Sequence, residues 1–373
     1  MSKQLDTIKE VVIKAGELAL SHQKNIAKLK VHVKKEGDIS TKADTECEKL
    51  IKDELNKHFE GFSFLAEESG EEKTTSDYTW IIDPIDGTKN FLSGLKSYGC
   101  CVCLKEKGET IASVIYFPAL DELYYASRDK DGAFLEFPHD ETAEVIKLDC
   151  SKKIELSHSL VSYGLWKYNF DKTASLLKKL QAKTAGTRSF GASSFEIIKV
   201  ARGEIGAFIA TSTTDWDVYP AGYIAEKAGA GIYDIQGQVI SKQDNYNADK
   251  GGCIACNKHL TEEILEAIKP TMEKAGEITR DVYNEKICPL ANKAVETSTP
   301  YVKEACKRSK PHMKRAVELS KELCIKSKPY FIKAWELIKT GCKKSLPYIL
   351  KALVWLKDMI VKLFTLIKDK IKK

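Results

Sequence analysis

The sequence Trp80-Ile81-Ile82-Asp83-Pro84-Ile85-Asp86-Gly87-Thr88-Lys89-Asn90-Phe91 carries the strongest structural and chemical signal in this chain. A short apolar run, typical of a strand, ends in two carboxylates three residues apart on a Pro/Gly turn. Acidic groups gathered where a strand ends are costly unless they are neutralised, and a divalent cation usually does this. Most Asp-x-x-Asp pairs are solvated turn residues, so this spacing alone is weak evidence for a metal site.

Two other acidic segments can join this turn. Phe64-Leu65-Ala66-Glu67-Glu68 is another apolar run that ends in acids, and Asp215-Trp216-Asp217 opens a helical pattern far downstream. Asp215 neighbours the better-placed Asp217, so we expect it at the rim of a site and not as a ligand. Four converging acids, Glu67, Asp83, Asp86 and Asp217, are hard to justify electrostatically without a metal.

These segments together resemble the inositol monophosphatase superfamily of magnesium-dependent, lithium-sensitive phosphatases, in its inositol-1-monophosphatase-like branch. The first family signature, Asp-Pro-(Ile/Leu)-Asp-Gly-Thr, is matched at residues 83–88. The second signature, Trp-Asp followed by a helix of small residues, is matched from Trp216 to Ala230. Residues 38–44 and 188–193 also agree, and the resemblance runs from about Lys3 to about Leu260.

The resemblance implies two or three Mg²⁺ ions and a water nucleophile. Glu67, Asp83 and the Ile85 carbonyl would bind the first metal. Asp83, Asp86 and Asp217 would share the second. Thr88 and Glu67 would orient the attacking water, with Glu68 or Asp44 behind them. The alternative role of Glu68 is that of a surface acid. The alternative role of Asp44 is only to start a helix.

The resemblance also implies the substrate contacts. The backbone N–H groups of Gly87 and Thr88 would meet the phosphate where a helix begins, which is an anion-binding position. Asp86 and Asp217 would contact substrate as well as metal. The helix start at Gly191, Ala192 and Ser193 would contact the substrate. Lys89 would lie next to the residues that make direct contacts.

Three positions depart from the inositol phosphatase pattern. Ala210 stands where a Glu usually holds the ring hydroxyls, seven residues before Asp217. Lys89 stands where Thr or Ser is common, and a lysine there is familiar from the related 3′(2′),5′-bisphosphate nucleotidases. Pro220 replaces a small residue, in what we expect to be the first turn of a helix, where proline is tolerated. These departures bear on the substrate and not on the metal chemistry.

Periodicity predicts a layered α/β or α+β protein over residues 1–269, in two halves of about 1–150 and 151–269. The resemblance narrows this prediction to an αβαβα sandwich. The predicted helices span 5–20, 43–58, 172–180, 193–201 and 218–228. The predicted strands span 62–66, 78–82, 99–104, 111–117, 123–126, 133–137, 206–210, 231–235 and 252–255, with a hairpin turn at Lys107-Gly108.

Residues 270–373 have a different character. They carry 24 Lys/Arg and 11 Asp/Glu, a balance of +13, whereas residues 1–269 carry −7. Cys288, Cys306, Cys324 and Cys342 recur every 18 residues, which is about five helical turns. Ser-x-Pro recurs at the same interval and suits helix starts. We therefore predict an added all-α region of short helices, which the family does not ordinarily have.

The sequence of this extension is compatible with several functions. Packing of its helices as a bundle is favoured over a helix lying on an anionic membrane. RNA ranks lower, because the extension has only three arginines and they are not interleaved with aromatics. A protein partner is a further alternative. No apolar run approaches the ~20 residues that span a bilayer, so we predict no transmembrane segment.

Eleven scattered cysteines indicate reduced thiols in a cytosol-like compartment, and Cys253–Cys256 fits core packing better than redox work. The charged N-terminus does not look like a signal peptide. We therefore predict a cytoplasmic protein, with peripheral membrane contact through the last helix as the variant. The family implies a homodimer.

The leading hypothesis is a Mg²⁺-dependent phosphomonoesterase that acts on inositol 1-phosphate or a similar sugar or polyol phosphate. The runner-up is 3′(2′),5′-bisphosphate nucleotidase or fructose-1,6-bisphosphatase activity. The hypothesis from a different class is a docking protein for the transcription machinery or a membrane that uses the basic extension. Retention of all four acids disfavours a purely structural role.

Overall fold

The computed structural model describes residues 2–26, 31–35, 38–164, 170–243 and 251–268. The predicted extension with its repeats lies outside the described residues, so the boundary at 269/270 stays a prediction. Within the described ranges, no helix is long and apolar enough to cross a membrane.

The first half is built on an eight-stranded sheet in the order β10-β9-β8-β7-β6-β5-β3-β4. Its neighbours are antiparallel except β3 and β5, which run parallel, so their carboxyl ends lie at the same edge. A short hairpin of β1 and β2 accompanies it. The strands are β1 Val31–Lys35, β2 Asp38–Thr41, β3 Ser63–Ala66, β4 Gly70–Glu72, β5 Tyr78–Asp86, β6 Gly99–Glu106, β7 Glu109–Phe117, β8 Glu122–Ser127, β9 Lys130–Glu136 and β10 Ile146–Leu148.

The second half is built on a five-stranded sheet in the order β12-β11-β13-β15-β14. Its strands are β11 Leu160–Gly164, β12 Gly186–Arg188, β13 Ala207–Ala210, β14 Ala230–Tyr233 and β15 Cys253–Asn257. The helices of the two halves are α1 Ser2–Gln23, α2 Lys42–His58, α3 Thr88–Leu92, α4 Phe170–Gln181, α5 Ser193–Ala201 and α6 Asp215–Lys227. Residues 261–268 are also helical.

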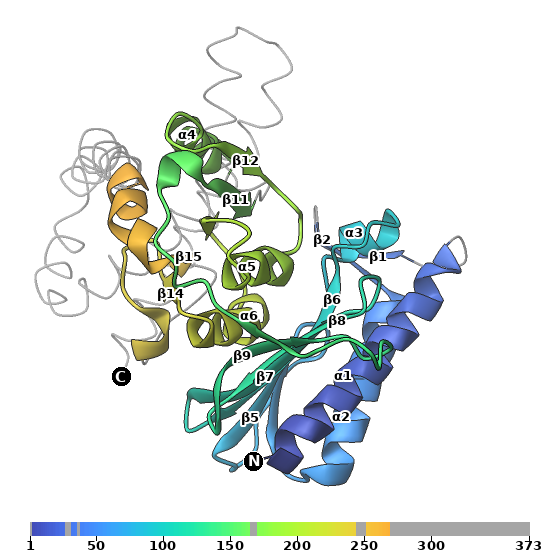
Figure 1. The fold of residues 1–373 in the computed structure, drawn as a ribbon. Helices are drawn as coiled ribbons and strands as arrows, with labels where there is room; N and C mark the ends of the chain where they lie inside the picture. The colour runs from blue at the N-terminus through green and yellow to red at the C-terminus, as the bar shows by residue number, and fades with distance from the viewer. Residues whose placement is uncertain (1, 27–30, 36–37, 165–169, 244–250, 269–373) are drawn as a thin grey trace, which may run out of the picture. The chain divides into compact units, whose positions relative to one another are not determined.

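These elements stack in five layers, which confirms the predicted αβαβα fold (Figure 1). Helices α1 and α2 cover one face of the large sheet, and α6 packs on its other face. Helices α5 and α6 lie between the two sheets. The outer face of the small sheet packs with Leu176 and Leu180 of α4 and with Ile264 and Ile268 of the last helix.

The middle layer explains the small residues of α6. Val218, Ala221, Ile224 and Ala225 are all buried in one cluster with residues from both sheets. A helix that is apolar on several faces is buried all round, as expected for one enclosed by two sheets. Its buried residues Ala221, Gly222 and Ala225 take up little space between the two sheets.

The structure corrects several element predictions. The prediction missed β1, β2, β4, β10, β11 and β12, most of which are short and lack a clean alternating pattern. The placement of Pro220 in the first turn of its helix was wrong, because α6 begins at Asp215 and Pro220 falls in the second turn. A capping box formed by Thr214 and Asp217 starts the helix there. The turn at Lys107-Gly108 is confirmed, with both residues at positive φ between β6 and β7.

Candidate metal and phosphate site

The end of strand β5 brings Asp83 and Asp86 together through an irregularity in the sheet. Residues three apart in a regular strand point to opposite faces. Here Asp83 pairs with Cys101 and Asp86 with Gly99, so β5 contains one residue more than β6 over this stretch. Such a bulge changes the direction of the side chains that follow it. Both carboxylates can therefore face the same point.

Asp217 reaches that point from the first turn of α6. Its Oδ2 accepts hydrogen bonds from Thr213 Oγ1 at 2.9 Å and from the Thr214 amide at 3.3 Å. The buried side chains of Asp83, Asp86 and Asp217 each offer one carboxylate oxygen, and these three oxygens lie within 4.8 Å of one another. Asp86 and Asp217, which are 131 positions apart in the sequence, are thus neighbours in the fold.

Burial and mutual repulsion raise the pKa of all three carboxyls. The pKa of Asp83 is raised well above its usual value, first by burial and then by the charges of Glu67, Asp86 and Asp217. Burial raises the pKa of Asp86 to about 6 and, with the Asp86 charge, that of Asp217 to about 7. The folded protein therefore carries an unbalanced cluster of acids that a cation would relieve.

Glu67 is the fourth acid of the cluster. It follows β3, the parallel neighbour of β5, and its amide donates to the Ile82 carbonyl at 3.2 Å. Its half-buried side chain raises the pKa of Asp83 by charge and by a side-chain hydrogen bond. Glu68 is also half-buried, and the predictions of a role behind the attacking water and of a surface role both stay open.

The turn after β3 is held by Glu48, a residue that sequence reasoning missed. Glu48 is buried on α2, and its two oxygens accept hydrogen bonds from the amides of Glu68 at 2.8 Å and Ser69 at 2.9 Å. A carboxylate that binds two successive amides fixes the direction in which the turn leaves the strand. The sequence feature that could have revealed Glu48 is an acid on the side of a predicted helix that is expected to be buried.

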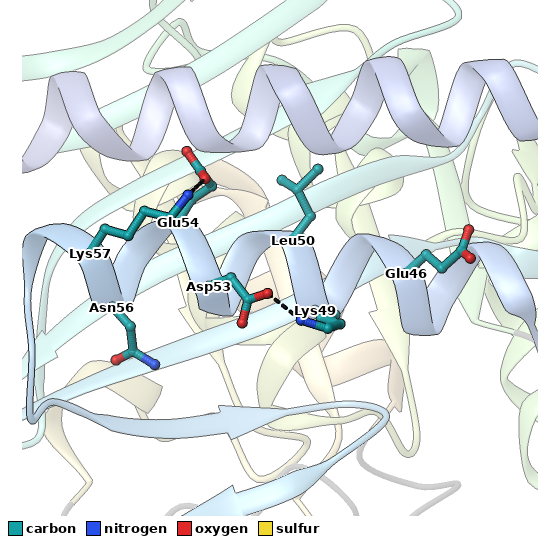
Figure 2. A pocket seen from close by; sticks show the side chains of 7 residues that line it. All are labelled: Glu46, Lys49, Leu50, Asp53, Glu54, Asn56 and Lys57. Atoms are coloured by element: carbon teal, nitrogen blue, oxygen red, sulfur yellow. Dashed lines mark hydrogen bonds and ion pairs between the residues drawn. The ribbon is translucent and has the colours of Figure 1, made fainter.

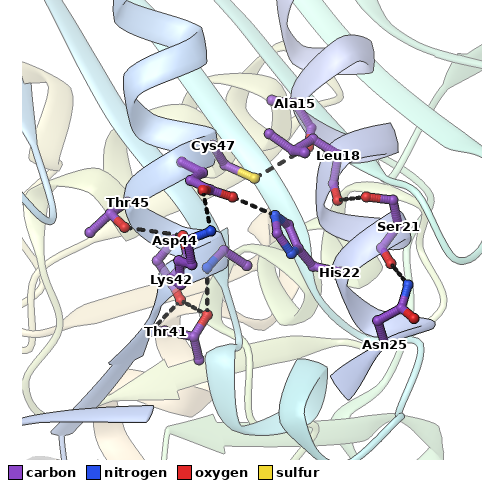
Figure 3. A network of polar contacts seen from close by, with 12 residues as sticks. Ala15, Leu18, Ser21, His22, Asn25, Thr41, Lys42, Asp44, Thr45 and Cys47 are labelled. Carbon is purple, nitrogen blue, oxygen red and sulfur yellow. Dashed lines mark hydrogen bonds and ion pairs between the residues drawn. The ribbon is translucent and has the colours of Figure 1, made fainter. Parts of the chain in front are cut away.

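Asp44 starts helix α2 and also contacts Thr88. It is the third residue of α2 and closes a capping box with Thr41, whose amide lies 2.7 Å from Asp44 Oδ2. Figure 3 shows Asp44 and Thr41 at this helix start. The other oxygen of Asp44 accepts from Thr88 Oγ1 at 3.2 Å. The residue therefore starts a helix and also touches the hydroxyl predicted to orient water.

The start of α5 is docked on Asp86. The amides of Ser193 and Ser194 donate to Asp86 at 3.2 and 2.8 Å, and the Ser194 hydroxyl donates to it as well. Because the Ser193 amide is bonded to Asp86, it could contact substrate as predicted only if Asp86 moved away. Ser194 was missed, because a serine in a first helical turn looks like an ordinary capping residue.

The remaining predicted residues surround this turn. Gly87 and Gly191 both have positive φ, at 85° and 78°. Ala192 is buried and Lys89 is exposed. Thr88 Oγ1 lies 3.2 Å from the Ile85 carbonyl oxygen, the predicted metal ligand. Ala210, which takes the place of the usual Glu, is buried at the end of β13.

A hollow elsewhere on the surface does not belong to this site. It lies along α2 and is lined by six charged or polar side chains and one leucine. Figure 2 shows these residues as Glu46, Lys49, Leu50, Asp53, Glu54, Asn56 and Lys57. Lys49 pairs with Asp53, and Lys57 pairs with Glu54. These pairs satisfy each other on a solvated helix face, so we assign no chemistry to the hollow.

The donor set of the acidic cluster fits Mg²⁺. All candidate ligands are oxygens, namely carboxylates and the Ile85 carbonyl, and Mg²⁺ prefers such ligands to nitrogen or sulfur. The identity of the ion and the number of ions stay predictions.

Comparison with known proteins places this chain in a family. Residues 1–273 match the sequence profile of the inositol monophosphatase family. The chain belongs to that family. As an inositol monophosphatase family member it is a phosphoric monoester hydrolase, and the resemblance stated above is confirmed.

Three relatives show how the family varies. The chain is 30% identical to an inositol-1-monophosphatase of Mesorhizobium japonicum, over 72% of this chain and 97% of the relative. It is 29% identical to a fructose-1,6-bisphosphatase/inositol-1-monophosphatase of Thermotoga maritima, over 73% and 98%. It is 27% identical to the Nus factor SuhB of Pseudomonas aeruginosa, over 69% and 92%.

A solved structure agrees with the fold. The extragenic suppressor protein suhB of Bartonella henselae superposes with a TM-score of 0.65 at 28% identity, covering 72% of this chain and 98% of that one. The matched part of the chain therefore corresponds to nearly the whole of this solved relative.

The raised pKa values of the cluster predict an inverse dependence of stability on pH without metal. The folded state holds protons on Asp86 and Asp217 up to about pH 6 and about pH 7, whereas the unfolded chain releases them near the ordinary value of 3.8. The free energy of unfolding in EDTA is therefore expected to fall as pH rises through this window. Thermal unfolding at pH 5.5 and pH 8 measures it.

The control for this prediction is Asp217→Asn, which cannot ionise and should flatten part of the slope. Mg²⁺ should raise the melting temperature more at pH 8 than at pH 5.5, because metal competes with protons for the carboxylates. A variant with the same pH slope as wild type would contradict the assignment.

Proposed function

We propose that this inositol monophosphatase family member hydrolyses a phosphate monoester in a Mg²⁺-dependent reaction, with inositol 1-phosphate as its first candidate substrate. The observation that carries the proposal is the convergence of Asp83, Asp86 and Asp217, with Glu67 hydrogen-bonded to Asp83. Bound Mg²⁺ would neutralise phosphoryl charge and lower the pKa of a bound water. The name of the Mesorhizobium relative supports the substrate.

The protein's own residues have three roles in this proposal. Glu67, Asp83, Asp86, Asp217 and the Ile85 carbonyl would hold the metal. The hydroxyl of Thr88, placed between the Asp44 carboxylate and the Ile85 carbonyl, would orient the attacking water. The backbone around Gly87 would receive the phosphate, where the chain turns from strand β5 into α3.

Replacing Thr88 by Val tests the water-orienting role. Val has a similar shape but lacks the hydroxyl, so we expect kcat to fall by about 10²-fold, the size of a lost proton-handling group. The melting temperature should change little, because Thr88 is only partly buried. Thr88→Ser keeps the hydroxyl and should retain most activity. Equal activity in Thr88→Val and Thr88→Ser would remove Thr88 from this role.

The alternative substrates are favoured by specific residues. Ala210 removes the acidic acceptor expected for ring hydroxyls, and exposed Lys89 next to Thr88 offers a cation to a second phosphate. A 3′(2′),5′-bisphosphate nucleotide or fructose 1,6-bisphosphate would bring such a phosphate. The name of the Thermotoga relative includes fructose-1,6-bisphosphatase.

A substrate panel tests the proposal. We would measure Mg²⁺-dependent phosphate release from inositol 1-phosphate, adenosine 3′,5′-bisphosphate and fructose 1,6-bisphosphate, with and without lithium, beside Asp86→Asn. Selective turnover that Asp86→Asn abolishes names the substrate branch. Folded protein with Mg²⁺ that releases no phosphate from any substrate would overturn the proposal.

A second role, as a docking protein for the transcription machinery, is suggested by the name of the Pseudomonas relative. The basic residues 270–373 would supply the contact, or a contact to RNA or an anionic membrane. Salt-dependent sedimentation of the full chain and of residues 1–269 with RNA or anionic liposomes tests it. We also propose a homodimer in the cytoplasm, which gel filtration with light scattering would check.

A further inference from the structure

The loop Phe190–Ala192, here called the 190–192 loop, lies directly against the turn that holds the candidate site. It joins strand β12 to helix α5, whose first amides bind Asp86. The approach is close: a Cβ built on Gly87 would lie 2.8 Å from the Ala192 Cβ. The position of this loop therefore sets where the second half of the chain meets the turn at Gly87 and Thr88 of the first half, here called the phosphate turn.

Asn90 holds the loop from the side of the first half. Its buried Nδ2 donates to the Phe190 carbonyl at 2.6 Å and to the Ser97 carbonyl at 2.7 Å. A Cβ on Gly191 would lie 3.2 Å from Asn90 Oδ1, so the loop backbone also packs tightly on this side chain. One amide thus ties the turn after Thr88 to a segment 100 residues away.

Glu196 holds the same loop from the side of the second half. Its Oε1 accepts the Phe190 amide at 2.7 Å and the Gly191 amide at 3.0 Å. Only 1% of Glu196 is exposed, and burying a carboxylate carries a large free-energy cost unless its hydrogen bonds repay it. Burial raises the pKa of Glu196 to about 7, and the hydrogen bonds from the two loop amides help to offset the cost of burying this carboxyl.

We propose that Asn90 and Glu196 are positioning residues that clamp the 190–192 loop from opposite sides. The clamp holds the α5 amides on Asp86 and keeps the backbone of the loop beside the phosphate turn. Neither side chain hydrogen-bonds to the acidic cluster in the contacts described above, so we assign both an action through the loop. The charge of Asp86 reaches Glu196 as well, as the smallest cause of the raised pKa of Glu196. The inference rests on the proposed function for its kinetic consequence, but the clamp itself can be observed without turnover.

The test compares Glu196→Leu, which removes the acceptor, with Glu196→Gln, whose amide oxygen can accept the same two N–H groups. Hydrogen–deuterium exchange of peptides covering residues 186–195 in the full chain reads the clamp directly. For Glu196→Leu we expect exchange at least about tenfold faster, and a rise of about tenfold in KM for inositol 1-phosphate, with kcat changed much less. Glu196→Gln should rescue both quantities.

A merely structural role for Glu196 would lower the melting temperature of Glu196→Leu while leaving loop exchange and KM unchanged, and that result overturns the proposal. If Glu196→Leu does not fold, Asn90→Ala opens the clamp from the other side and should give the same increase in exchange. If wild type hydrolyses no substrate, the proposed function fails, and the dissociation constant for inorganic phosphate in the presence of Mg²⁺ replaces KM. Unchanged exchange in both variants refutes the clamp in either case.

Discussion

Asp83→Asn is expected to lower Mg²⁺-dependent phosphate release by about 10³-fold or more while raising the melting temperature of the protein in EDTA. Asp83 lies at the centre of the cluster, and burial together with the charges of Glu67, Asp86 and Asp217 raises its pKa. An asparagine keeps the Oδ1 acceptor for the Ile85 amide, now 3.0 Å away. It removes an acid that the metal-free folded state must hold either as a repelling charge or with a bound proton, so activity and stability should move in opposite directions.

The matched control is Asp131→Asn. Asp131 is an exposed acid paired with Lys147, and its replacement should change neither quantity appreciably, since exposed ion pairs contribute little to stability. Phosphate release and thermal unfolding in EDTA and in Mg²⁺ are the measurements. Activity of Asp83→Asn within about threefold of wild type would remove Asp83 from the metal site, because a lost metal ligand costs far more. A lower melting temperature in EDTA would contradict the electrostatic argument.

Gly87→Ala is expected to lower both stability and activity. Gly87 has φ of 85°, a left-handed conformation that costs an alanine roughly 1–2 kcal/mol. The new methyl would also lie 2.8 Å from the Ala192 Cβ and 2.9 Å from the Ser97 carbonyl oxygen. Overpacking adds a further cost of about 1–3 kcal/mol. The two segments must separate, so we expect kcat/KM to fall by about 10²-fold in the folded protein, the scale of a misplacement near 1 Å.

Gly94→Ala separates backbone strain from crowding. Gly94 has a similar φ of 74° two residues after α3, and a Cβ there would meet nothing within 4 Å. It should cost only the conformational part of the stability loss, with kcat/KM near wild type. Urea unfolding and steady-state kinetics of both variants provide the comparison. Equal effects of the two substitutions would show that the approach of Ala192 to Gly87 has no functional weight.

Much of the fold could be predicted from residue patterns, because buried faces leave a clear periodicity. The prediction of α5 as residues 193–201 agrees with the structure at both ends, and the hairpin at Lys107-Gly108 follows from a turn that needs two positive φ angles. The start of α6 was harder to predict. The segment Asp215-Trp216-Asp217 was expected to open a helical pattern, but the regular helix was predicted only from residue 218. The actual start depends on the hydrogen bond from the Thr214 amide to the Asp217 carboxylate.

The candidate site divides along similar lines. The acids Glu67, Asp83, Asp86 and Asp217 could be named from sequence, since three segments that each carry acids at a strand or helix end predict a cation site together and the family signatures cover them. Glu48, Ser194 and Glu196 could not, because each looks like a common helical residue. Their roles consist of hydrogen bonds to segments that only folding brings near.

Residue identity alone predicted the chemical kind of this protein: the candidate oxygen ligands, the glycine that turns the chain after them, the layered α/β pattern and the family. The tertiary structure decided how those groups meet. Whether Asp83 and Asp86 share a side depends on one extra residue in β5 relative to β6, and whether Asp217 joins them depends on α6 lying between two sheets. Side-chain identity is local information. The distance between the carboxylates of Asp86 and Asp217 follows instead from the packing of segments 131 positions apart, and a local sequence pattern carries no information about that packing.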